Sequence, residues 1–71
     1  MHILVFKTNI DSAEAFKEIG SLLGSDQSIL DWHIDKEDVD KVLRIESELN
    51  NTHTIISTIS KAGFLCEELP D

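Results

Sequence analysis

The side chains that could perform chemistry lie in a junction segment at residues 7–12, an acidic run at 35–40, and a single cysteine at position 66. The junction segment, Lys-Thr-Asn-Ile-Asp-Ser, separates an apolar run from an amphipathic one. It offers amide, hydroxyl and carboxylate oxygens, but it contains no thiol and no glycine-rich phosphate loop. Such oxygen donors suit hydrogen bonds and hard cations and do not suit soft metal ions.

The other polar groups do not form a catalytic or calcium-binding pattern. Nucleophilic catalysis needs a serine or cysteine held by a base inside a pocket, and a chain of 71 residues has little room to enclose one. We therefore predict that the protein is not an enzyme. The acidic run lacks the glycine at the sixth position and the spaced glutamate of an EF-hand, so we interpret it as a solvated turn.

Length, charge and cysteine content restrict the class of protein. The chain is long enough for one core, and we expect a single domain over residues 1–71. Its formal net charge of −8 repels phosphate backbones and anionic lipids, which argues against nucleic-acid and membrane partners. With Cys66 as the only cysteine and no stretch of membrane-spanning length, we expect a cytoplasmic protein without an intrachain disulfide.

Hydrophobic periodicity predicts four strands. Residues 2–8 are apolar at both parities, as in a central strand with both faces covered, and residues 64–69 form a last short strand. Residues 28–35 alternate, with Leu30, Trp32 and Ile34 on the buried face. A turn at 36–38 leads to a second alternating run in which Leu43 and Ile45 point inward, so the two runs form a hairpin.

Two segments carry helical spacing. The first begins at a cap, Asp11 or Ser12, and ends near Gly24, with apolar positions at Ala13, Phe16, Ile19, Leu22 and Leu23. The second begins within residues 50–52 and ends at Gly63, with an apolar stripe of Ile55, Ile56, Ile59 and Ala62. The order β-α-β-β-α-β predicts an α+β, ferredoxin-like sandwich, in which two helices cover one face of a four-stranded antiparallel sheet.

This architecture leaves one face of the sheet without helices. We expect Leu4, Phe6 and Val42 on or near that uncovered face. An apolar patch there would bind a second copy of the chain, as a homodimer, or another protein partner. The alternative is that long polar side chains shield these residues from water.

The whole pattern resembles the heavy-metal-associated domain, the fold of small copper chaperones and of metal-binding modules in metal-transporting ATPases. The stretches that carry the resemblance are residues 3–8, similar to the first strand of that family, residues 32–45, similar to its central hairpin, and residues 55–69. The last stretch contains Ala62-Gly63-Phe64, a step typical of the family's final helix and strand.

The resemblance gives the junction segment a specific meaning. Members of the family bind Cu(I) or Zn(II) through a Met-Thr-Cys-x-x-Cys loop. When the threonine of that loop is matched to Thr8, its two cysteine positions are occupied here by Asn9 and Ser12, and its methionine position by Lys7. An amide and a hydroxyl cannot replace thiolates for a soft ion. We therefore expect a degenerate loop at Thr8, Asn9 and Ser12 with no metal and no cofactor, in a small interaction or regulatory module.

A metal carrier or sensor for copper or zinc is the alternative. Cys66 would then bind the ion with a histidine or with a ligand from a partner. His2, His33 and His53 show no short ligand spacing, and we expect the last strand to project Cys66 away from the junction segment.

Overall fold

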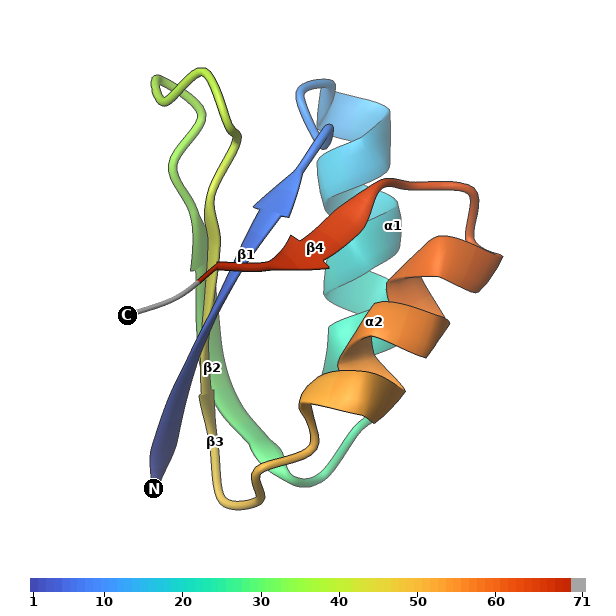
Figure 1. Cartoon of the computed structure of the whole chain (residues 1–71). Coiled ribbons are helices and arrows are strands. Elements are labelled where there is room, and N and C mark those ends of the chain that lie inside the picture. Colours follow the sequence, from blue (N-terminus) through green and yellow to red (C-terminus); the bar gives the residue numbers. More distant parts are fainter. Residues whose placement is uncertain (70–71) are drawn as a thin grey trace.

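The computed structural model describes residues 1–69 (Figure 1). Its elements, in order along the chain, are β1 (His2–Thr8), α1 (Ala13–Gly24), β2 (Ile29–Ile34), β3 (Leu43–Ser47), α2 (Thr52–Lys61) and β4 (Cys66–Glu68). The predicted order of strands and helices is confirmed. No helix in residues 1–69 is long and apolar enough to cross a membrane.

The four strands form one antiparallel sheet in the order β2-β3-β1-β4. Both helices pack on the same face of this sheet (Figure 1). The fold is therefore the predicted ferredoxin-like sandwich. The hydrophobic core lies between the two layers and includes Ile19, Leu43, Ile45 and Ile59, each with none of its surface exposed.

Leu4 and Phe6 belong to this core, which corrects the expectation that they lie on the uncovered face. In the β1–β3 register they stand opposite Ile45 and Leu43, and they are 7% and 0% exposed. Because side chains alternate along a strand, Ile3 and Val5 take the uncovered face instead. The apolar run of β1 has no alternation of its own, so only its pairing with β3 decides which parity is buried.

A second correction concerns Leu30 in β2. The register with β3 shifts between Ile29 and Asp31, which leaves Leu30 as the extra residue of a β-bulge and 51% exposed. Ile29 packs against the core in its place. Trp32 and Ile34 keep the predicted inward orientation.

The helix boundaries follow local chemistry. Ser12 caps α1, and its Oγ accepts a hydrogen bond from the Ala15 amide at 3.1 Å. Ala15 is the buried alanine of the first turns, whereas Ala13, expected on the apolar stripe, is exposed. Gly63 follows α2 with a φ of +95°, the left-handed conformation expected of a helix terminator.

Candidate functional site

Thr8 anchors the junction segment to the loop that joins β2 and β3. Its amide donates to the Asp40 carbonyl at 3.0 Å, and its hydroxyl donates to the Lys41 carbonyl at 2.6 Å. The same hydroxyl oxygen accepts a hydrogen bond from the Ile10 amide at 3.3 Å. Thr8 is 3% exposed, so its hydroxyl is a buried structural group whose bonds lie within the chain.

Asn9 and Ser12 occupy the positions that the resemblance assigns to thiolates, and both side chains bond the backbone. The Asn9 Oδ1 atom accepts a hydrogen bond from the Leu65 amide at 2.9 Å, which ties the junction segment to the residue before β4. The Ser12 Oγ atom caps α1. These oxygens therefore stabilise the loop and the start of the helix.

Lys7, at the position of the family's methionine, is part of an exposed ion pair. Its Nζ lies 3.8 Å from a carboxylate oxygen of Asp40, and both side chains are 43% exposed. An ion pair this open to solvent contributes little to stability.

Cys66 lies beside the junction segment, contrary to expectation, because it pairs with Thr8 in the β1–β4 register. Its side chain points into the core and is 7% exposed. Burial raises the pKa of this thiol to about 11, so it is protonated at neutral pH. Only a thiolate is a good ligand for copper or zinc, and this cysteine has little thiolate character.

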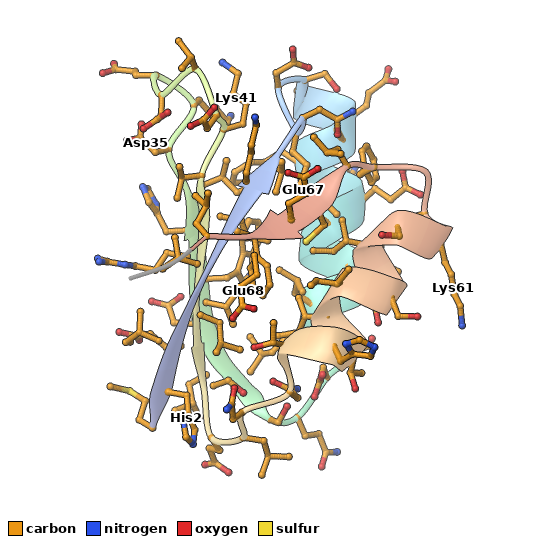
Figure 2. All side chains as sticks on the ribbon, in the orientation of Figure 1. His2, Asp35, Lys41, Lys61, Glu67 and Glu68 are labelled. Atoms are coloured by element: carbon orange, nitrogen blue, oxygen red, sulfur yellow. The ribbon has the colours of Figure 1, made fainter. Side chains whose placement is uncertain are left out.

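The three histidines lie apart from Cys66 on exposed surface. Figure 2 shows His2 at the beginning of β1, at the opposite end of the sheet from Lys41. His33 lies in β2, and His53 lies in the first turn of α2. Within residues 1–69, no three histidine, cysteine or acidic side chains come together as a metal-binding group.

The sheet face that the helices leave uncovered, here called the open face, is the second candidate site. It presents Ile3, Val5, Lys7, Asp31, His33, Val42, Arg44 and Glu46. A shallow hollow on this face is lined by two apolar side chains, Val5 and Val42, and by the polar side chains of His33, Asp35, Asp38 and Arg44. The alternation of β3 in the sequence places Arg44 and Glu46 outward, as the structure has them, whereas the placement of Ile3 and Val5 needed the register.

Comparison with solved structures identifies the fold. The chain is similar to the yeast copper transporter domain Ccc2a, solved in apo and Cu(I)-loaded states, with a TM-score of 0.83, 16% identity and coverage of 100% of this chain and 99% of that one. It is also similar to the N-terminal domain of ZntA in its Zn(II) form, with a TM-score of 0.78, 12% identity and coverage of 93% and 89%.

A third structure, described as concerning crosstalk between Cu(I) and Zn(II) homeostasis, has a TM-score of 0.80 at 8% identity over 97% of this chain and 100% of the other. No protein-family model matches the chain, and no curated protein matches it in sequence. At these identities the likeness concerns the fold, which is that of the heavy-metal-associated domains.

Proposed function

We propose that this protein is a small, non-enzymatic interaction or regulatory module of the cytosol, built on the heavy-metal-associated fold without its soft-metal site. The observation that carries the proposal is the use of the oxygens of Asn9 and Ser12. Each accepts a hydrogen bond from a backbone amide, that of Leu65 or Ala15, at the positions where thiolates would hold an ion. These side chains give the loop its conformation and do not supply soft donors.

The burial of Cys66 argues against the metal-carrier alternative. A carrier must release and accept its ion at the surface, and this thiol faces the core with a raised pKa. Its neighbour across the strands, Thr8, is equally buried.

Metal retention tests the proposal. The purified protein is loaded with Zn(II) or, under reducing conditions, with Cu(I), and then dialysed against a chelator before the bound metal is quantified by mass spectrometry. We expect no stoichiometric metal in the natural protein. The variant N9C/S12C supplies the missing thiols and should retain metal, while N9A/S12A removes the same hydrogen bonds without adding sulfur. Stoichiometric metal in the natural protein that survives dialysis would refute the proposal.

The open face is the surface that we propose for a protein partner. Ile3 is 38% exposed on it, and Val5 and Val42 are partly exposed beside it. Apolar side chains on a face that no helix covers favour a protein contact. Val5→Glu should weaken binding of any partner that uses this face, whereas Val39→Glu, on a turn residue that is 91% exposed, should leave binding unchanged. Equal effects of both variants would contradict this surface.

A further inference from the structure

Strand β2 forms a free edge of the sheet, and its outward hydrogen-bonding groups can be assigned. The Asp35 amide donates to the Val42 carbonyl at 2.9 Å, just beyond the last β2–β3 pair, Ile34 and Leu43. Asp35 and Val42 are therefore a hydrogen-bonded pair of the antiparallel ladder. Bonding alternates along an antiparallel ladder. His33 and Asp31 therefore bond to β3, while Trp32 and Ile34 direct their amide and carbonyl groups toward the free edge.

The outward amide of Trp32 has a local partner. It donates to the Asp31 carboxylate at 2.9 Å, in an exposed contact between neighbouring residues. Asp31 lies on the open face with His33, two residues along the same strand. The free edge thus carries one acidic and one imidazole side chain, placed on either side of Trp32.

We propose that two copies of this chain pair through their β2 edges, antiparallel and centred on Trp32, to form one continuous sheet. In this register the Trp32 residues of the two copies face each other and exchange two backbone hydrogen bonds. Asp31 of each copy stands opposite His33 of the other, twice by symmetry. The Asp31 carboxylate leaves the Trp32 amide of its own chain and accepts from the opposing imidazole, which has an N–H donor in either protonation state.

Charge selects this register over its neighbours. A two-fold symmetric antiparallel pairing that keeps both open faces on the same side has one residue of β2 at its centre. The registers next to the proposed one are therefore centred on Asp31 or on His33. Centring on Asp31 would oppose two carboxylates, which repel each other, and centring on His33 would oppose two imidazoles and leave the Asp31 carboxylates without a donor across the strands. Of these three registers, only the one centred on Trp32 places an imidazole N–H opposite each Asp31 carboxylate. Two copies of a chain with net charge −8 repel each other, so a local contact between an acidic group and a hydrogen-bond donor is needed where they meet.

Apolar groups at the same edge support self-pairing. Leu30 is 51% exposed on the bulge at this edge, where a paired second strand would cover part of its apolar surface. Trp32 is only partly buried, and its ring packs against Phe16 with the ring centroids 5.0 Å apart. Pairing would bring this aromatic pair together with its counterpart on the helix side of the joined sheet. The inference is independent of the partner proposed for the open face, which stays accessible in such a dimer.

The test combines dilution with a charge swap. Sedimentation equilibrium gives the dimer dissociation constant, and amide chemical shifts measured over a range of concentrations locate the contact. We expect concentration-dependent shifts within residues 30–34. H33D places two carboxylate pairs across the dimer axis and should raise the dissociation constant about tenfold. The double variant D31H/H33D exchanges the two side chains, so that each carboxylate again faces an imidazole, and should restore it.

A matched control and the refuting results complete the design. H53D makes the same charge change at an exposed residue of α2 and should leave the dissociation constant unchanged. Thermal unfolding of each variant verifies that the fold is retained. A natural protein that remains monomeric at millimolar concentration would overturn the proposal. So would concentration-dependent shifts centred on Ile3, Val5 and Val42, or a charge-swap variant that associates as weakly as H33D.

Discussion

Truncation of Phe6 gives the sharpest test of how β1 is oriented. The side chain has no exposed surface and packs between the sheet and the helices, opposite Leu43. Replacing a fully buried phenylalanine by alanine removes its transfer free energy and leaves a cavity, at a cost of about 3–5 kcal/mol. A domain of 71 residues has a free energy of unfolding of about 4–11 kcal/mol at typical values per residue. Phe6→Ala should therefore remove a large part of the stability.

Denaturant unfolding followed by fluorescence measures this loss. Trp32 is the only tryptophan and packs against Phe16, so its emission reports on the folded core. Phe6→Leu should cost about 1–2 kcal/mol and remain folded, which keeps the test informative if Phe6→Ala is unfolded. Val5→Ala, on the adjacent residue of the open face, is the control and should cost less than Phe6→Leu. A Phe6→Ala variant that loses less than about 1 kcal/mol would place Phe6 on the surface and refute the described register.

Two further predictions concern the junction segment and the cysteine. Asn9→Ala removes the acceptor of the Leu65 amide and should lower the free energy of unfolding by about 1 kcal/mol. The control is Asn50→Ala, at an exposed asparagine before α2, which should cost less. Equal losses in the two variants would contradict a structural role for Asn9. Because the pKa of Cys66 is raised to about 11 in the folded protein, the unfolded thiol ionises first, and stability should be unchanged below pH 8 and fall as the pH rises from about 9 to 11. The difference between the unfolding midpoints of the natural protein and of Cys66→Ser should change over this range, because only the natural protein carries the thiol, and parallel curves would show that Cys66 is not buried as described.

Local sequence was sufficient to predict the elements and their ends. Ser12 was one of two predicted caps of the first helix, and Gly63 marked the end of the second; both act through bonds or dihedral angles of their own immediate neighbourhood. The hairpin residues Leu43 and Ile45 were also placed on the correct face, because polar residues alternate with them. Information that is local in the chain can be predicted from the chain.

The faces of β1 and the bulge in β2 could not be predicted in this way. Residues 3–6 are apolar without interruption, so either parity satisfied the pattern, and the structure buries Leu4 and Phe6. Leu30 continued an alternation that the bulge interrupts. The hydrogen bond from the Leu65 amide to Asn9 joins residues 56 positions apart, and no spacing rule predicts such a contact.

The sequence by itself determined the order of elements, the fold class, the net charge and the absence of thiols from the junction segment, because each depends on residue types and short spacings. Only the tertiary structure decided which side of β1 meets the helices, that Cys66 lies buried beside Thr8, and that Asn9 accepts a hydrogen bond from the residue before β4. These outcomes depend on strand register and on packing between distant segments. Both are set when the sheet assembles and the core excludes water.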